Sequence, residues 1–368
     1  MLEPGPSHRL HGTRGDLMTT GLDAHTFVLP DELSATSPPE ARGLARDEVR
    51  LMVADGGVLT HARFGELPGF LRPGDLVVVN NSAMINAAVD AQYDGNEAVL
   101  HCSTRLDDGR WVVELRDPAG VPWRGRPLEC GVSVRLPAGH VATVWSRWLP
   151  DGDRLWIADI IAPGRDAGED VEALLARHGR PISYSYLTDR WSASYYRTVF
   201  GREPGSAEMP SAGRPFTERL VTELVAGGVG LAPITLHTGV SSPESGEPPS
   251  PERFAVPEMT ARVVNATRAA GGRVVAVGTT VTRALESATG AEGLVRATTG
   301  WTDLVLDGSR PARAVDGLIT GWHAPGASHL HLLESVAGAG VVREAYRVAV
   351  ESGYLWHEFG DSALLFRE

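Results

Sequence analysis

The pattern of apolar residues changes along this chain, and the change limits the folds that the chain can adopt. Between about residues 87 and 161, short alternating segments such as 96–102, 111–116 and 140–148 are separated by Asp-Gly and Pro-Ala-Gly turns. Several short strands at such spacing are typical of a small antiparallel barrel. After Asp170 the pattern becomes helical and then alternates strand, helix and strand, which favours a mixed α/β domain.

We therefore expect a mixed α/β or α+β fold, in which an α/β domain carries a small inserted antiparallel β-barrel domain. The α/β domain is expected to comprise residues 21–86 and 170–368, and the barrel domain residues 87–169. A chain of 368 residues is long enough for two such domains, because a domain commonly contains roughly 150 residues. We expect residues 1–20 to form a flexible N-terminal tail.

The composition excludes several classes of enzyme. All 34 basic residues are arginines, and the absence of lysine excludes pyridoxal-phosphate Schiff bases and P-loop nucleotide sites. The two cysteines, Cys102 and Cys130, have no zinc-binding spacing, so we expect no metal. Because no run of about 18 apolar residues occurs, we expect a cytoplasmic protein without a membrane segment.

The segment GRVVAVGTTVTRALES, residues 272–287, is the clearest candidate for a ligand site. It predicts a buried strand that ends near Gly278, followed at once by a helix that begins near Thr279 and Thr280. The free amides of a helix N-terminus, with these hydroxyls and Arg283 one turn later, suit a carboxylate, a phosphate or a ribose. The same spacing also fits an ordinary capped turn, and spacing alone leaves both interpretations open.

Other polar residues follow predicted strands. His237 ends GLAPITLH, and His323 lies beyond a strand end beside a Pro-Gly turn, where a histidine could act as a general acid or base. Asn80 and Asn81 end DLVVVN and could hold a purine or sugar edge. Each of these residues could equally serve as a local hydrogen-bonding or turn-capping group. The residue patterns alone indicate a two-domain protein with enzyme-like features.

A series of motifs takes the interpretation further. In chain order they are FVLPDEL, RDEVRLMV, LRPGDLVVVNNS, VFGREPGSAEMPSAGRPFTERL, GVGLAPITLHTG, GRVVAVGTTVTRALES, GWTDL, VDGLITGWHAPGAS and ESGYLWHEFGDSALLF. Together they resemble the S-adenosylmethionine:tRNA ribosyltransferase-isomerase family of queuosine biosynthesis, from about residue 27 to residue 366.

The resemblance implies a reaction as well as a fold. S-adenosylmethionine would serve as the ribosyl donor and tRNA as the partner, in a protein that we expect to be monomeric and free of metal. The ribosyl unit would pass to the aminomethyl group of 7-aminomethyl-7-deazaguanine at the wobble position, with release of adenine and methionine and rearrangement to epoxyqueuosine. Such chemistry needs a base for the ribose methylene beside the sulfonium and an acid for the departing adenine.

The resemblance also implies roles for particular residues. His237, His323 and Glu252 match positions that would transfer protons. The positions that would bind and orient the ligand are Asn80, Asn81, Gly213, Thr217, Gly278, Thr279, Thr280, Arg283, Asp316 and Thr320.

The chain departs from the family pattern at several polar positions. Ala83 and Ala88 stand where the family typically has arginines, Pro215 where it has a histidine and Gly326 where it has a lysine, while His329 appears in the helix that follows. Because the net charge of the chain is −12, any surface that binds tRNA must be a local basic patch. Two alternatives therefore stay open: a divergent paralogue that uses S-adenosylmethionine or a related nucleoside with a non-tRNA acceptor, and a non-catalytic binding protein.

Overall fold

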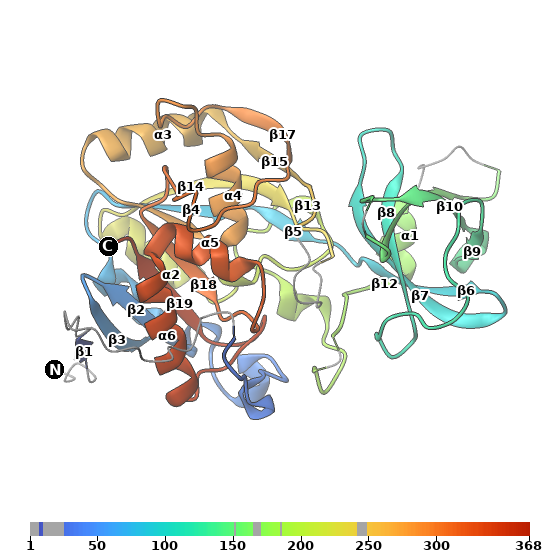
Figure 1. Ribbon diagram of the computed structural model, residues 1–368, viewed down its shortest axis with the longest axis horizontal. Helices are drawn as coiled ribbons and strands as arrows, with labels where there is room; N and C mark the ends of the chain where they lie inside the picture. The colour runs from blue at the N-terminus through green and yellow to red at the C-terminus, as the bar shows by residue number, and fades with distance from the viewer. Residues whose placement is uncertain (1–6, 10–25, 151, 165–170, 185, 241–248) are drawn as a thin grey trace.

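Two large sheets divide the molecule into an α/β part and a smaller barrel (Figure 1). The structure is a computed structural model that describes residues 7–9, 26–150, 152–164, 171–184, 186–240 and 249–368. The expected mixed fold with an antiparallel barrel is confirmed. The predicted N-terminal tail lies outside the described residues, apart from the short strand β1 (Ser7–Arg9), which pairs with β3.

A ten-stranded sheet forms the centre of the α/β part. In spatial order its strands are β1, β3 (Val58–Arg63), β2 (Arg50–Asp55), β19 (Ser362–Phe366), β18 (Gly317–Gly321), β16 (Val274–Val277), β4 (Leu76–Asn80), β14 (Gly230–His237), β15 (Glu252–Val256) and β17 (Thr298–Thr302). The four neighbours β18, β16, β4 and β14 run parallel. Strands β16 and β4 are buried at every residue, because both faces of the sheet are covered, and this is why they appear as continuous apolar runs.

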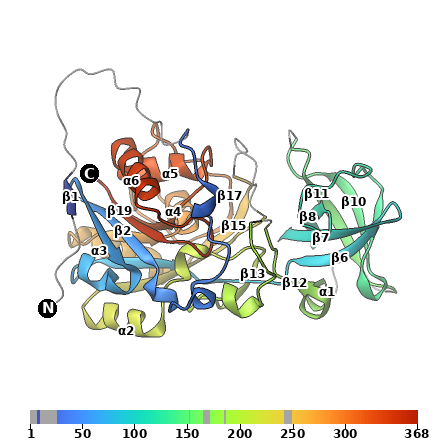
Figure 2. The same ribbon diagram turned by 90° about the horizontal axis from the view of Figure 1, so that it is seen from below.

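Helices cover the two faces unequally. One face packs against α3 (Glu258–Ala269), α4 (Thr279–Ser287), α5 (His329–Ala337) and α6 (Ala339–Glu351), while the other packs against α2 (Glu218–Ala226) and 3₁₀ turns. Figure 2 shows α5 and α6 on one side of the sheet and α2 on the opposite side. None of the helices in the described ranges has the length and apolar character needed to cross a bilayer.

The second sheet closes on itself. Six antiparallel strands form the barrel, in the order β6 (Ala88–Tyr93), β7 (Asn96–Arg105), β8 (Trp111–Arg116), β11 (Leu155–Ile161), β10 (Val141–Arg147) and β9 (Ser133–Arg135), and β9 pairs back with β6. Alternate residues such as Leu100, Val113 and Ala158 fill its interior.

Two elements that follow residue 170 also belong to this sheet and its core. Helix α1 (Val171–His178) packs Leu174 and Leu175 into the barrel interior, and β12 (Gly179–Arg180) pairs with β6. Both elements lie within residues 170–368, which we assign to the α/β domain. The first residues of that range therefore pack with the barrel. The division into domains stays a prediction.

A two-stranded parallel sheet lies between the two parts. Strand β5 (Ser82–Met84) leads from the central strand β4 toward the barrel, and β13 (Glu203–Ser206) pairs with it. Figure 1 shows both strands between the large sheet and the barrel. Polar residues that follow the large sheet are therefore brought close to segments that enter and leave the barrel.

Candidate functional site

A cavity of about 420 Å³ opens at the carboxyl ends of the parallel strands β16 and β18. In open α/β sheets, ligands bind at this edge. The wall is built from segments far apart in sequence: the start of α4, the loop after β18, a turn before α2, a tyrosine-containing loop and the turn before β19. Its polar lining residues are Tyr184, Tyr186, Tyr196, Glu208, Ser211, Thr238, Thr279, Thr280, Thr320, Trp322, His323, His329, His357 and Glu358.

The start of α4 brings Gly278, Thr279 and Thr280 to the cavity wall, where sequence reasoning places a ligand. Gly278 has φ 93°, a conformation that favours glycine, and a Cβ at this position would lie 3.3 Å from the Cβ of Ala212. This turn lets the backbone change direction directly into the helix. The first amides of α4 are consequently available at the cavity, as an anionic or hydroxyl-bearing ligand requires.

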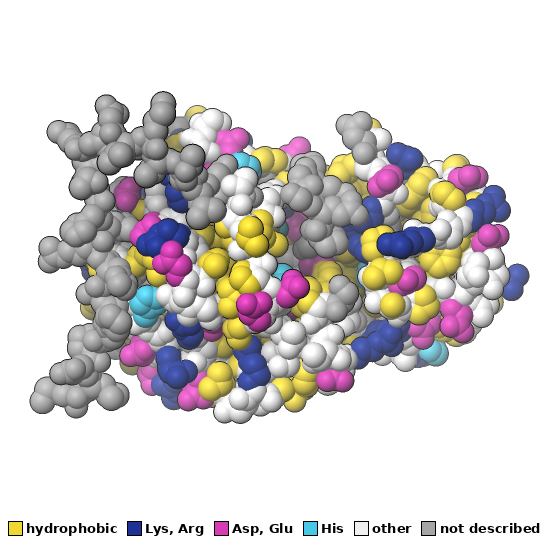
Figure 3. Space-filling view, turned by 60° about the horizontal axis from the view of Figure 1, so that its bottom comes forward, with side chains coloured by type: hydrophobic (Ala, Val, Ile, Leu, Met, Phe, Trp, Pro, Cys, Tyr) yellow, Lys and Arg dark blue, Asp and Glu magenta, His cyan; other side chains and the backbone are white. Residues whose placement is uncertain are grey.

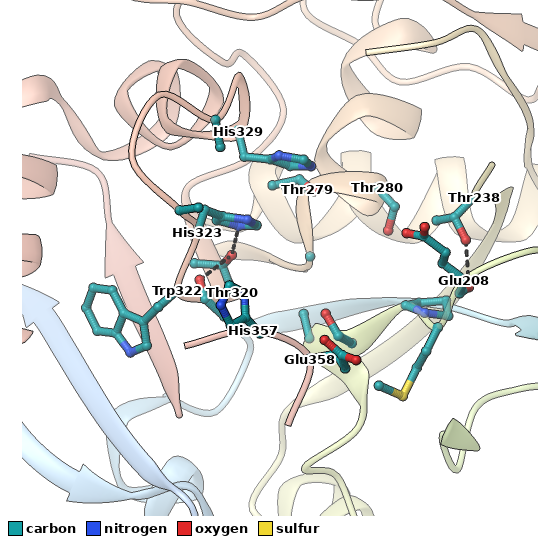
Figure 4. Close-up of a pocket in the computed structure, with 18 of the residues that line it drawn as sticks. Glu208, Thr238, Thr279, Thr280, Thr320, Trp322, His323, His329, His357 and Glu358 are labelled. Atoms are coloured by element: carbon teal, nitrogen blue, oxygen red, sulfur yellow. Dashed lines mark hydrogen bonds between the residues drawn. The ribbon is translucent and has the colours of Figure 1, made fainter. Parts of the chain in front are cut away.

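His323 and Thr320 lie together on the same wall, as Figure 4 shows. The Thr320 hydroxyl donates to the Gly321 carbonyl at 3.1 Å, so its oxygen accepts from Nε2–H of His323 at 3.0 Å. The His323 main chain is fixed as well, because its carbonyl accepts from the Trp356 indole at 3.0 Å. This arrangement fits the Nε2–H tautomer, in which the Nδ1 lone pair of His323 is a proton acceptor.

A second imidazole stacks on His323. The rings of His323 and His329 have centroids 4.5 Å apart and are parallel within 2°. Burial lowers the pKa of His323 well below its usual range, and the neighbouring His329 and His357 lower it further. Burial also lowers the pKa of His329 to about 4. Both rings are therefore neutral near pH 7, the form in which an imidazole can accept a proton.

The asparagine doublet bonds mainly within the sheet, and Asn80 also donates a long hydrogen bond of 3.5 Å to Thr280 Oγ1 at the cavity wall. The Asn80 side chain accepts from the amides of Ser82 and Leu236, both at 3.0 Å, and donates to the Leu236 carbonyl at 2.8 Å. The Asn81 side chain accepts from Thr235 Oγ1 at 2.6 Å. Both asparagines thus hold the end of β4 against β14. Of the two interpretations of these residues, the geometry displays the local hydrogen-bonding role.

His237 lies beside the cavity-lining Thr238 but points elsewhere. Its Nδ1 is 2.8 Å from Ser82 Oγ, and its ring packs so closely on Gly205 that a Cβ there would lie 2.6 Å from Nδ1. Burial lowers the pKa of His237, with a smaller contribution from Arg253. The structure therefore places His237 against β5 and β13, and it is not among the described residues that line the cavity.

Glu252 and Arg283 form a buried ion pair behind the cavity wall. The Arg283 guanidinium also donates to the carbonyls of Leu304 and Thr302, each at 3.1 Å, and Glu252 accepts from the Gly239 amide at 3.3 Å. Burial raises the pKa of Glu252, although the Arg283 charge opposes this shift. With these partners the pair joins α4 to β15 and β17.

The three remaining predicted residues have local structural contacts. Gly213 lies in a 3₁₀ turn (Ser211–Gly213), and Thr217 caps α2 by accepting from the Leu220 amide at 3.2 Å. Asp316 precedes β18, at the end of the strand opposite the cavity, and accepts from the Val274 amide at 2.9 Å. The structure thus brings Gly278, Thr279, Thr280, Thr320 and His323 together and places the other predicted residues around them.

Sequence reasoning missed one whole side of the cavity. Tyr184, Tyr186 and His357 form a stack there: Tyr184 lies 5.7 Å from Tyr186 with an angle of 10°, and Tyr186 lies 4.2 Å from His357 with an angle of 16°. Glu208 and Glu358 accept hydrogen bonds from Tyr184 and Tyr186. His357 in this region has an unusual positive φ of 72°, but this backbone angle is visible only in the structure and not in the sequence.

Comparison with known proteins agrees with this arrangement. A family model described as "Queuosine biosynthesis protein" matches residues 22–365. The chain is 35% identical over 356 residues to the S-adenosylmethionine:tRNA ribosyltransferase-isomerase of Moorella thermoacetica, covering 94% of this chain and 99% of that one. It is also 35% identical to the protein of the same name from Rhodospirillum rubrum, with 94% and 97% coverage.

A solved structure shows the same likeness. The crystal structure of an S-adenosylmethionine tRNA ribosyltransferase from Thermotoga maritima superposes with a TM-score of 0.51 at 28% identity, covering 93% of this chain and 99% of that one. The likeness therefore extends over nearly the whole length of both chains. On its sequence and its fold, the chain belongs to the queuosine biosynthesis protein family.

Proposed function

We propose that this protein transfers and isomerises the ribosyl moiety of S-adenosylmethionine onto 7-aminomethyl-7-deazaguanine in tRNA, giving epoxyqueuosine-tRNA and releasing adenine and methionine. The observation that carries the proposal is a neutral, oriented His323 on the wall of a cavity that also presents the first residues of α4. The Moorella and Rhodospirillum relatives carry the name of this activity over nearly their whole length.

The site residues suit the first step. A positive sulfonium acidifies the adjacent ribose methylene, and the Nδ1 lone pair of His323 is the group that we propose removes its proton. Thr320 keeps Nε2 protonated, so the basic nitrogen is defined before the substrate arrives. The amides and hydroxyls at Thr279 and Thr280 would hold the ribose hydroxyls of the donor. We further propose that Glu252 and His237 take part in proton transfer, with Arg283 and Ser82 as their respective partners.

A tRNA partner requires a local basic surface, because the whole chain has a net charge of −12. Figure 3 shows arginine side chains on the barrel beside acidic ones. Two of the barrel arginines already have acidic partners, since Arg105 pairs with Glu172 at 2.8 Å and Arg110 with Asp108 at 2.6 Å. Phosphates would compete with these carboxylates, so we propose tRNA binding that weakens steeply with salt, in a monomeric cytoplasmic enzyme.

The decisive experiment measures adenine and methionine released from S-adenosylmethionine by chromatography. The reaction is run with tRNA that carries the deazaguanine precursor, with tRNA that lacks it, and without tRNA. Release that depends on the precursor tRNA supports the proposed function. Binding of S-adenosylmethionine without release under any of these conditions refutes it and supports a non-catalytic binding protein.

A second candidate is ribosyl transfer to a small acceptor that is not part of tRNA. The observation that favours it is the position of two departures from the family pattern: Gly321, which stands where the family typically has an asparagine, and His329 both line the cavity. Adenine release with the free 7-aminomethyl-7-deazaguanine base, at a rate equal to that with the precursor tRNA, would support this candidate. Release only with the tRNA would exclude it.

A further inference from the structure

The cavity wall away from the His323–His329 pair carries two carboxylates, Glu208 and Glu358 (Figure 4). Each is held by a tyrosine, since Tyr184 donates to Glu208 and Tyr186 donates to Glu358. Among the described residues that line the cavity, these two glutamates are the charged side chains, and none is an arginine. With neutral imidazoles on the opposite wall, the field inside the cavity favours a cation.

A buried hydroxyl on the same side has no partner in the described part of the chain. Tyr196 is 4% exposed and lines the cavity, and its hydroxyl makes no hydrogen bond there. Burial raises the pKa of the Tyr196 phenol, and the nearby Glu358 carboxylate raises it further. An unpaired buried hydroxyl is costly, because it has lost its contact with water. It is therefore a separate sign that a polar group binds between Tyr196 and Glu358.

We infer that Glu208, Glu358 and the Tyr196 hydroxyl form a subsite for a primary ammonium group, and that this group is the aminomethyl substituent of the acceptor base. An ammonium offers three N–H donors and no acceptor, and the subsite offers two carboxylates and a phenolic oxygen to receive them. The inference rests on the proposed function, and it assigns the acceptor to the tyrosine side of the cavity and the donor to the His323 side.

The same carboxylates suit the next step. An ammonium cannot attack carbon, so the acceptor nitrogen must first lose a proton. That proton would pass from the nitrogen to Glu358, giving a neutral amine and a carboxylic acid, with no other reactant. Burial raises the pKa of Glu358, an effect that the Tyr186 hydrogen bond and the Arg214 charge oppose, and a carboxylate of raised pKa accepts a proton more readily.

Calorimetric titration of the full-length protein tests the subsite. The probes are an anticodon stem–loop that carries 7-aminomethyl-7-deazaguanine, the same stem–loop with the neutral 7-cyano-7-deazaguanine, and S-adenosylmethionine. We expect Glu358→Gln and Tyr196→Phe each to weaken binding of the amine about tenfold or more, while binding of the nitrile and of S-adenosylmethionine changes little. Tyr196→Phe should retain or raise the melting temperature, because its hydroxyl has no partner to lose.

Tyr93→Phe in the barrel is the matched control. The Tyr93 hydroxyl donates to the Pro127 carbonyl at 2.9 Å, so its removal should lower the melting temperature and leave amine binding intact. Equal affinity of the wild-type protein for amine and nitrile, or binding of neither, overturns the inference. Weaker binding of S-adenosylmethionine with unchanged binding of the amine also overturns it, because the subsite would then hold the ammonium of the donor.

The outcomes separate this inference from the proposed function. In one outcome the wild-type protein prefers the amine, Glu358→Gln abolishes this preference, and the wild-type protein releases no adenine. That result supports the subsite and refutes ribosyl transfer. In another outcome adenine release depends on the precursor, and the Michaelis constant for the stem–loop is the same in Glu358→Gln and Tyr196→Phe as in the wild-type protein. That result refutes the subsite and leaves ribosyl transfer supported.

Discussion

Thr320→Val tests whether a single hydroxyl defines the basic nitrogen of His323. Thr320 is 2% exposed, and valine keeps its volume while removing its oxygen. Nε2–H of His323 then loses an acceptor at 3.0 Å, and the Gly321 carbonyl loses a donor at 3.1 Å. A net contribution of about 1 kcal/mol for a neutral hydrogen bond corresponds to about fivefold in kcat/KM for adenine release. Two unpaired, partly buried groups should also lower the free energy of unfolding, by about 1 kcal/mol.

Thr302→Val is the control for that experiment. Thr302 is also 2% exposed, and its hydroxyl contacts Ser287 Oγ at 2.6 Å and accepts from the Leu304 amide at 3.2 Å. It lies in β17, outside the cavity, so it should lose comparable stability in urea unfolding and keep kcat/KM. Initial rates with precursor tRNA provide the assay. Wild-type kcat/KM in Thr320→Val, or an equal loss in both variants, would refute the tautomer argument.

Three further outcomes are expected. His323→Gln removes the proposed base, so the rate of adenine release should fall about 10²–10⁴-fold while calorimetry shows retained S-adenosylmethionine binding; a smaller fall would move the base elsewhere. The pKa of His329 falls from 6.5 to about 4 on folding, so the unfolded chain binds the proton and stability should be complete above about pH 6.5 and decline toward pH 4. His329→Leu should flatten this decline in urea titrations, and an unaltered decline would contradict the assignment. Glu252→Gln leaves the Arg283 charge buried and unpaired, so the free energy of unfolding should fall by about 3 kcal/mol; wild-type stability with lost turnover would instead place Glu252 in proton transfer.

The sheets could be predicted because their signals are local. Strands buried on both faces, such as β4 and β16, appear as continuous apolar runs, and barrel strands appear as alternating ones. The strand-to-helix turn at Gly278 could also be predicted, because an apolar run passes directly into a helical pattern with a glycine between them. The packing of α1 with the barrel could not, since its helical pattern says nothing about which core receives Leu174.

The members of the site were less predictable, because strand ends look alike in sequence. Asn80 and Thr320 both end buried parallel strands, yet the shorter hydrogen bonds of Asn80 go to the neighbouring backbone, whereas Thr320 bonds to His323. Which one faces the cavity depends on the segments packed above it. The same limit applies to Tyr186 and Glu358, which are 172 positions apart in the chain and meet only in the folded protein.

The position of β19 has a consequence for biosynthesis. This strand is the last in chain order, yet it lies inside the large sheet, between β2 on one side and β18 on the other. Among the described strands, β19 alone pairs with both the early hairpin of β2 and β3 and the parallel strands, so the hairpin cannot join the large sheet before residues 362–366 have been synthesised. Among the described residues, the barrel sheet takes no strand from beyond β12, so its strands can pair while synthesis continues. Premature termination shortly before residue 362 should therefore yield a folded barrel attached to an unassembled sheet.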